Sequence, residues 1–537
     1  MLRITDIKLK LDHSNSDLEV VIIKRLGIPR KDLLGYSVFK RSYDARRKNE
    51  IKLIYTLLVD VKNEKYILRK KRKDNTIRIA PDISYKFVAH APDNLSERPL
   101  IVGSGPSGLF AGLVLAQMGF KPIILERGKP VRERTEDTFG FWRKRELNPE
   151  SNVQFGEGGA GTFSDGKLHT QIKDKNHHGR KVLTEFVEAG APEEILYISK
   201  PHIGTLKLVK IVEKMRNTIQ GLGGEVLFNS RVDDLISEDD KLRGVVLANG
   251  DKLHSEHVIL AIGHSARDTF EMLYKRGVQI EAKPFSIGLR IEHPQPMIDE
   301  CRFGDNAGHQ ILGAADYKLV HHSSIGRSVY SFCMCPGGTV LAASSEPGTV
   351  VTNGMSQYSC NAGNANSAIV VEVFPKDYHE SPIAGMEFQR KWEQKAFELG
   401  GGNYDAPGQL VGDFLAGRAS SKFGTVQPSY KPGVKLGDLS KSLPDYVIDS
   451  IREALPVFEK NIKGFVMEDA ILTGVETRTS SPVRILRDKD FQSVNVAGLY
   501  PSGEGSGYAG GILSSAVDGI KAAEAVALSI VEAFEII

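Results

Sequence analysis

The sequence predicts an α/β fold in three parts: a small N-terminal α+β domain, a Rossmann-like domain that the C-terminal segment completes, and an inserted mixed α/β cap domain. Three observations lead to this prediction. The 537 residues exceed the roughly 250–300 residues at which a single core stops growing. A strand–helix–strand pattern with a glycine-rich turn begins at Leu100. From about residue 270 to residue 480 that regularity is lost.

Residues 1–93 are predicted to form the N-terminal domain. Alternating apolar residues predict strands at Ile4–Leu9 and Ile51–Val61, with a helix over Ser16–Leu26 between them. We expect one more short strand immediately before the basic run Arg69–Lys73.

Composition is that of an ordinary soluble protein, with 41% hydrophobic residues, 26% charged residues and a formal net charge of +3. The charge is uneven, because residues 1–98 hold 23 Lys and Arg against 13 Asp and Glu. That excess suits a solvated basic face, or a surface that binds a polyanion such as RNA.

The four cysteines show neither the C-x-x-C spacing of a dithiol centre nor the spacing of a zinc site. We therefore expect a reducing compartment, no metal and no disulfide-reductase mechanism. The first residues lack an apolar signal segment. The uncharged stretch Pro99–Phe120 contains five glycines, which favour a strand, a turn and a helix over a membrane span. A cytoplasmic protein without membrane contact is expected.

The sharpest motif is a glycine-rich turn between a predicted strand at Leu100–Val102 and a predicted helix over Ser107–Met118. Its glycines allow a tight turn, close approach of a pyrophosphate and close packing of helix on strand. The helix N-terminus offers free N–H groups and a favourable dipole to phosphates. Glu126 ends the next strand, where a carboxylate accepts from a ribose hydroxyl. The turn consists of Gly103, Ser104, Gly105, Pro106, Ser107 and Gly108.

Two downstream segments favour FAD over NAD. Val258–Gly263 resembles the Ala-Thr-Gly segment of glutathione-reductase-type FAD domains, with Ile262 in place of the threonine. A predicted strand at Val494–Tyr500 leads into Gly498–Glu504, which resembles the segment that holds the ribityl chain in such proteins. A helix from about Ile512 to Ala527 would then direct its positive end toward the flavin. The residues that this resemblance assigns to FAD are Ala261, Gly263, Gly503, Glu504, Gly510, Gly511 and Ile512.

A further glycine-rich segment, Phe155–Lys167, lies beyond the first strand–helix–strand unit. Its glycine density suits backbone contact with a planar ring or a phosphate, although a flexible surface loop has a similar composition. We predict a flavin contact here. The predicted cofactor-binding residues therefore also include Arg127, Gly158, Gly159, Thr162, Ser164, Lys167 and Val232.

Four stretches together resemble the bacterial uncharacterised FAD-dependent dehydrogenases, a family of NAD(P)/FAD-dependent oxidoreductases. They are Gly103–Glu126, Gly158–Gly159, Met355–Ser367 and Thr477–Arg484. The resemblance covers the whole chain, including the basic N-terminal part. It implies a bound FAD and a soluble bacterial protein, and it implies no particular substrate.

Four residues are candidates for substrate binding, and each has an ordinary alternative role. Cys335 could place a thiol near the flavin or be a buried structural cysteine. Arg478 and Arg484 could clamp an acidic substrate or form surface or structural pairs. Asn366 could orient a ligand or form a turn. No catalytic residue is assigned.

We predict that residues 94–270 and 485–537 form the FAD domain and that residues 271–484 form the cap domain. The expected function is that of an FAD-dependent dehydrogenase, in which a hydride passes through flavin N5 between a small-molecule substrate and a second donor or acceptor. The chain has no second glycine-rich turn of the dinucleotide-binding type, because Gly221–Gly224 precedes a strand and does not open a helix. NAD(P)H is therefore a candidate donor that would bind without a Rossmann domain of its own. The alternatives are a flavin monooxygenase and an RNA-linked flavoprotein that uses the basic N-terminal domain.

Overall fold

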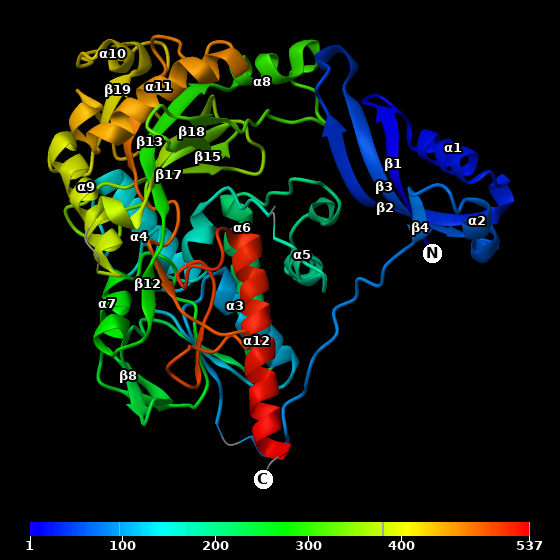
Figure 1. Ribbon diagram of the computed structural model, residues 1–537, viewed down its shortest axis with the longest axis horizontal. Helices are drawn as coiled ribbons and strands as arrows, with labels where there is room; N and C mark the ends of the chain where they lie inside the picture. Colours follow the sequence, from blue (N-terminus) through cyan, green and yellow to red (C-terminus); the bar gives the residue numbers. More distant parts are fainter. Residues whose placement is uncertain (96, 169, 171, 379–380, 536–537) are drawn as a thin grey trace.

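The computed structural model describes residues 1–95, 97–168, 170, 172–378 and 381–535, so the last two residues of the predicted FAD domain lie outside it (Figure 1). Three main sheets organise the chain: one N-terminal, one parallel, and one large and mostly antiparallel. Helices pack against each of them. The predicted mixed α/β fold class is confirmed.

The N-terminal sheet has the strand order β2-β3-β1-β4, and its buried face shares a core with helix α1. The prediction of a strand immediately before the basic run is wrong, because these residues form helix α2. Its sequence, EKYILRK, consists mostly of good helix formers, with an acidic first turn and a basic last turn that suit the helix dipole. The elements are β1 Leu2–Lys10, α1 Asn15–Leu26, β2 Leu33–Asp44, β3 Lys52–Val61, α2 Glu64–Lys70 and β4 Ile77–Ile79.

The parallel sheet has the strand order β23-β11-β5-β6-β7, and each neighbouring pair runs parallel. This is the strand order of a doubly wound fold, with its topological switch point between β5 and β11. The last strand is shorter than predicted, because Gly498 turns the chain at φ +85° immediately before it. The strands are β5 Leu100–Val102, β6 Ile123–Leu125, β7 Glu225–Leu227, β11 Val258–Leu260 and β23 Leu499–Pro501.

Alternate residues of these short strands face opposite layers. Ile101 and Ile259 pack with the helices, among them α3 (Pro106–Gln117) and α12 (Ile512–Glu535), which lie together in Figure 1. Leu100 and Val102 instead pack toward a three-stranded sheet on the other face. The remaining elements of this region are α4 Val131–Lys144, α5 His178–Glu188, α6 Thr205–Gly221, β8 Val232–Glu238, β9 Lys241–Leu247, β10 Lys252–His254 and α7 Arg267–Lys275.

The large sheet has the strand order β14-β15-β18-β13-β21-β19-β20, and its central strands are fully buried. Strands β12 and β22 pair where the chain enters and leaves this region. The elements are β12 Ile280–Ala282, β13 Phe285–Pro294, α8 Gln295–Phe303, β14 Val320–His322, β15 Ser328–Cys335, β16 Gly338–Ala342, β17 Thr352–Ser356, β18 Asn364–Val373, α9 Ala384–Gly400, β19 Ala406–Leu410, α10 Val411–Ala416, β20 Val434–Leu436, α11 Asp445–Asn461, β21 Ile471–Glu476 and β22 Val483–Ile485.

The uncharged stretch Pro99–Phe120 forms β5, the glycine turn and α3, as predicted. Within the described parts of the chain, we find no helix that combines the length and the apolarity needed to cross a bilayer.

Candidate functional site

A cavity of about 390 Å³ opens at the carboxyl ends of β5, β6, β11 and β23, where open α/β sheets bind their ligands. Most of the predicted cofactor residues line it, and strands of the large sheet supply the facing wall. The predicted residues that line the cavity are Gly103, Ser104, Gly105, Pro106, Ser107, Glu126, Arg127, Gly159, Ser164, Lys167, Val232, Ala261, Gly263, Arg478, Gly503, Glu504, Gly510, Gly511 and Ile512.

Glycines shape the turn between β5 and α3 in the way that a bound dinucleotide requires. Gly103 adopts φ +101°, and a Cβ there would lie 2.4 Å from Ala261 O. A Cβ on Gly108 would lie 1.9 Å from Gly103 O, so this glycine lets α3 sit close to β5. Among the described residues, a Cβ on Gly105 would meet only Gly159 Cα, at 3.8 Å. The backbone at Gly105 is therefore open to the cavity, where a pyrophosphate fits.

Glu126 lies at the end of β6 and is almost fully buried. Its Oε2 accepts hydrogen bonds from the Ser104 N–H at 2.9 Å and from Ser104 Oγ at 2.6 Å. Its Oε1 accepts from the N–H groups of Gly128 at 2.9 Å and Gly156 at 3.0 Å. The carboxylate thus joins three loops of the cavity wall, and a ribose hydroxyl would share its oxygens with these donors.

The segment after β23 is joined directly to the glycine turn and to α12. Ser502 Oγ lies 2.8 Å from Ser107 Oγ, and the Gly503 N–H donates to Asp518 on α12 at 2.8 Å. A Cβ on Gly519 would lie 2.1 Å from Ser107 O, so α12 and α3 are in close contact. The C-terminal residues are therefore part of the cavity and of its support.

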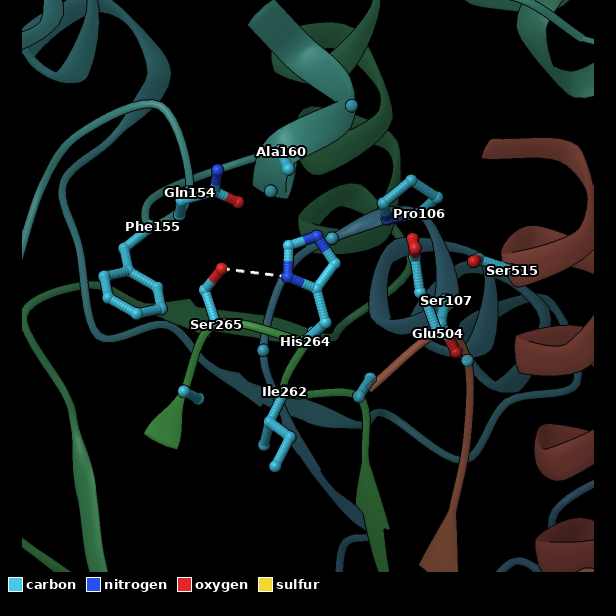
Figure 2. A pocket seen from close by; sticks show the side chains of 18 of the residues that line it. Pro106, Ser107, Gln154, Phe155, Ala160, Ile262, His264, Ser265, Glu504 and Ser515 are labelled. Atoms are coloured by element: carbon cyan, nitrogen blue, oxygen red, sulfur yellow. Dashed lines mark hydrogen bonds between the residues drawn. The ribbon is translucent and has the colours of Figure 1, made fainter. Parts of the chain in front are cut away.

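Glu504 follows this segment, and Figure 2 shows its side chain on the same side of the cavity as Ser107 and Ser515. Burial raises the pKa of the Glu504 carboxyl to about 7, although the nearby Lys283 ammonium acts to lower it. The group can therefore hold a proton near neutral pH.

Helix α12 begins at the cavity, directly after Gly510 and Gly511. A Cβ on either glycine, or on Gly263, would meet no atom of the described residues within 4 Å. The start of this 24-residue helix lends positive potential to that part of the cavity. Open glycine backbone at the β5 turn leaves room for the pyrophosphate of FAD, and that at the start of α12 leaves room for the flavin, so these residues fit the cofactor.

The glycine-rich loop enters the site only in part. Gly159, Ser164 and Lys167 line the cavity, whereas Gly158 and Thr162 do not. A Cβ on Gly158 would lie 2.0 Å from Thr162 Oγ1, because both residues point into the interior of the loop. Thr162 is buried, and its hydroxyl donates to Glu157 O at 3.3 Å. These two residues support the loop instead of facing a ligand.

Arg127 and Val232 lie at the β6 side of the cavity, where Glu126 would place the adenosine. The Arg127 guanidinium stacks on Phe155 at 4.1 Å and forms ion pairs with Glu150 and Asp268, both at 2.9 Å. Its position is therefore fixed by the protein.

Of the four substrate candidates, the structure brings only Arg478 to the cavity. Cys335 is fully buried behind Cys333, which lines the cavity in its place. Asn366 is also fully buried, and its Oδ1 accepts from Arg290 at 2.5 Å. Arg484 is half exposed outside the cavity, where it pairs with Glu281 at 3.0 Å.

The Arg478 guanidinium belongs to a buried charge network. It forms an ion pair with Glu393 at 3.0 Å, and Arg267 pairs with the same carboxylate at 2.8 Å. Burial acts to raise the pKa of Glu393, but the two guanidinium groups outweigh it and lower that pKa. Arg478 Nη1 also donates to Ser265 Oγ at 3.0 Å and to Ser345 Oγ at 2.6 Å, so all three guanidinium nitrogens have partners within the protein.

Sequence reasoning missed several residues of the cavity wall. His264 directly follows the predicted Gly263, and Figure 2 shows its ring in the cavity between Phe155 on one side and Glu504 on the other. Burial lowers the pKa of His264 to about 3, assisted by Arg478, so the ring is neutral. Proximity to the Gly263 motif was the only sequence signal for His264. On the facing wall the sequence predicted only Arg478, and the residues missed there are Phe332 and Cys333 on β15, Asn353 on β17, Glu476 on β21 and the adjacent Thr479.

Comparisons with known proteins relate the chain to FAD-dependent proteins. The family model described as FAD-dependent protein, C-terminal domain-like, matches residues 284–479, and a model of a domain of unknown function matches residues 1–60. An uncharacterized protein of Clostridium beijerinckii is 50% identical over 537 residues, which cover 100% of this chain and 99% of that protein.

Solved structures give more distant likenesses. Glycine oxidase from Bacillus cereus is 12% identical, with 80% of this chain and 95% of that chain covered and a TM-score of 0.32. The glycerol-3-phosphate dehydrogenase from Bacillus halodurans, complexed with FAD, is 13% identical and has a TM-score of 0.36. The match covers 82% of this chain and 66% of that chain. Likenesses this distant leave the reaction open.

Proposed function

Because the chain belongs to the family of FAD-dependent proteins that includes the uncharacterized protein of Clostridium beijerinckii, we propose that it is an FAD-dependent oxidoreductase. The observation that carries the proposal is the convergence of the β5 turn, the segment after β23 and the start of α12 on one cavity. When bound there, FAD supplies a centre that accepts or donates a hydride.

Each part of the cavity would hold a different part of the cofactor. The open backbone at Gly105 and the N-terminus of α3 would bind the pyrophosphate. Glu126 lies toward β6 and would bind the adenosine ribose, whereas Glu504 lies at β23 and would bind the ribityl hydroxyls. The start of α12 would stabilise negative charge on the flavin pyrimidine.

The wall from the large sheet is where we place the substrate. Arg478 is the cationic group of that wall, and its partners Glu393 and Ser265 fix its orientation. The two-point face of its guanidinium is already engaged by Glu393, and its Nη1 donates to two serine hydroxyls. Arg478 would therefore attract an anionic group through its remaining Nη2 hydrogen and its positive charge. We therefore favour a small substrate that carries an acidic group.

Anaerobic reduction tests the proposal. The FAD-loaded protein is mixed with NADH, NADPH and a panel of small amino acids and hydroxy acids while the oxidised flavin absorbance is followed. Loss of that absorbance with a donor from the panel supports the proposal, and Arg478→Lys should then raise KM for an acidic substrate. Oxygen consumption that requires both NAD(P)H and a second substrate would favour a monooxygenase. A flavin that dithionite reduces but no donor reduces would contradict our choice of substrate class.

A further inference from the structure

Strand β15 ends in an irregular segment at the cavity wall. Phe332 pairs with Ala368 on β18 and Cys335 pairs with Asn366, so the ladder shifts register between them. Cys333 adopts φ +44°, in the left-handed region that residues with a Cβ rarely occupy. This bulge places Cys333 on the wall of the cavity and returns Cys335 to the sheet. Such local strain is often found at functional sites.

The bulge also brings the two thiols together. The sulfurs of Cys333 and Cys335 and a carboxylate oxygen of Asp165 all lie within 4.8 Å of one another. Cys335 is fully buried, and its Sγ lies 3.5 Å from Asp165 Oδ2. The absence of C-x-x-C spacing led us to expect no dithiol centre. The bulge nevertheless brings the sulfurs of this C-x-C pair within 4.8 Å of each other.

A fixed charge pair adjoins the thiols. Lys167 Nζ lies 2.6 Å from Asp165 Oδ2 and also donates to Met334 O, the residue between the cysteines. A hydrogen bond from Cys335 lowers the pKa of the Cys333 thiol, and Lys167 acts in the same direction against burial. The pKa of Cys335 is raised by the same contact. The cavity-facing cysteine is thus the better thiolate of the two.

Cys333 and Glu504 line the same cavity. Burial is the main cause of the raised pKa of Glu504, and a negative charge on Cys333 adds to it. These two residues, which come from β15 and from the segment after β23, therefore face the same space.

We propose that Cys333 and Cys335 form a dithiol–disulfide pair that exchanges two electrons with FAD in this cavity, an inference that rests on the proposed function. In the oxidative direction two S–H bonds break and one S–S bond forms. The two electrons and two protons released pass to oxidised FAD, which becomes fully reduced. In the other direction reduced FAD returns them to the disulfide. The pair thereby allows a thiol or disulfide compound to act as the second redox partner.

The alternative role for this cluster is a metal site. Asp165 already carries the Lys167 ammonium, whose charge opposes a cation at the same carboxylate. A structural zinc site also requires four ligands, whereas the cluster within the described residues offers three. The dithiol pair is therefore the better explanation, and the test below separates the two.

The first measurement counts electrons in the FAD-loaded protein. Anaerobic titration with dithionite should consume four electrons per FAD in the oxidised wild type, two for the flavin and two for the disulfide. Cys333→Ser and Cys335→Ser should each consume two. Cys301→Ser is the matched control, because Cys301 lies on α8 away from the cavity, and it should still consume four. Equal FAD content in all four proteins shows that they have folded.

The second measurement needs no flavin. After mild oxidation of the full chain and alkylation, the peptide that contains both cysteines should be lighter by two hydrogens and unmodified, whereas Cys301 and Cys360 are alkylated. If the wild type consumes only two electrons per FAD in the dithionite titration, and Cys333 and Cys335 are both alkylated, the proposal of a dithiol–disulfide pair is wrong. Stoichiometric zinc that protects both thiols would also overturn it. Loss of the proposed function would appear separately, as protein that binds no FAD yet still forms the disulfide.

Discussion

At the residue scale, the fold itself does not require glycine at position 105, whereas a bound pyrophosphate would. Its backbone has φ −68°, which any residue adopts, and a Cβ would be in ordinary contact with Gly159. The branches of a larger side chain would instead extend into the cavity at the place of the pyrophosphate.

We therefore expect Gly105→Val to weaken FAD binding at least tenfold while the free energy of unfolding of the apoprotein changes by no more than about 1 kcal/mol. Flavin titration and urea unfolding measure the two quantities. Gly140→Val is the matched control, because a Cβ there meets no described atom within 4 Å and the residue lies on α4 outside the cavity. Normal FAD affinity in the Gly105 variant would show that the phosphates bind elsewhere.

Glu504 is expected to contribute to cofactor affinity through the ribityl hydroxyls. Replacement Glu504→Ala should weaken FAD binding by about 1–3 kcal/mol, the cost of leaving a buried hydrogen-bonding group without its partner. Isothermal titration of the apoprotein with FAD measures this loss. Glu281→Ala serves as control, because its carboxylate pairs with Arg484 outside the cavity. Equal losses in both variants would deny Glu504 a specific role.

The sequence predicted the parts of the site that depend on local backbone. Gly103, Gly105 and Gly108 were identifiable because the turn itself demands glycine. Cys333 was missed in favour of Cys335, since only the bulge in β15 decides which thiol reaches the cavity. Arg484 was misplaced for a related reason: a two-stranded ladder with β12 directs it toward Glu281.

At the element scale, α5 and α12 are joined by a buried histidine. His178 Nε2 lies 3.1 Å from Glu524 on α12, and its Nδ1 lies 3.5 Å from Asp174. Burial acts to lower the pKa of His178, but the two carboxylates outweigh it and raise the pKa to about 9. A raised pKa means that the folded state binds this proton more tightly than the unfolded state does.

The stability supplied by His178 should therefore be complete below pH 6.5, its ordinary pKa, and be lost as the pH rises through about 9. Thermal unfolding of wild type should show Tm falling over this window, and His178→Gln should remove most of that fall. His322→Gln, a change at an exposed position, should leave the profile as in wild type. A fall of equal size in the His178 variant would assign the pH dependence to other groups.

Elements with strong alternation or a glycine boundary were predictable from sequence, such as β3, α3 and the β9–β10 hairpin. Helix α2 was not, because its seven residues include too few buried positions to show a helical period. The strand at β23 was overextended, since Gly498 rather than hydrophobicity determines where pairing begins.

At the scale of the whole molecule, the N-terminal sheet contacts the rest of the protein along β2 and the residues that follow it. The Arg41 N–H on β2 donates to Tyr197 O at 2.6 Å, the Ser199 N–H donates to Arg41 O at 2.9 Å, and Tyr43 packs edge-on against Phe303. Beside β2 lies a second cavity of about 860 Å³, and Asp165 and Lys167 line both cavities.

Removal of residues 1–79 should consequently leave a folded protein that binds FAD in a 1:1 ratio, with Tyr85 still bonded to Glu524. Size-exclusion chromatography and flavin absorbance measure this. An insoluble truncation would show that the N-terminal sheet is part of the main core.

The central claim is that the cavity at the carboxyl ends of β5, β6, β11 and β23 is built for FAD. Its most direct test is to denature the purified protein, after reconstitution with a mixture of FAD and FMN, and to identify the released flavin by chromatography and mass. We expect FAD, at one per chain, because Gly105 and Glu126 provide for a pyrophosphate and an adenosine ribose that FMN lacks. Release of FMN, or of no flavin at all, would contradict the account.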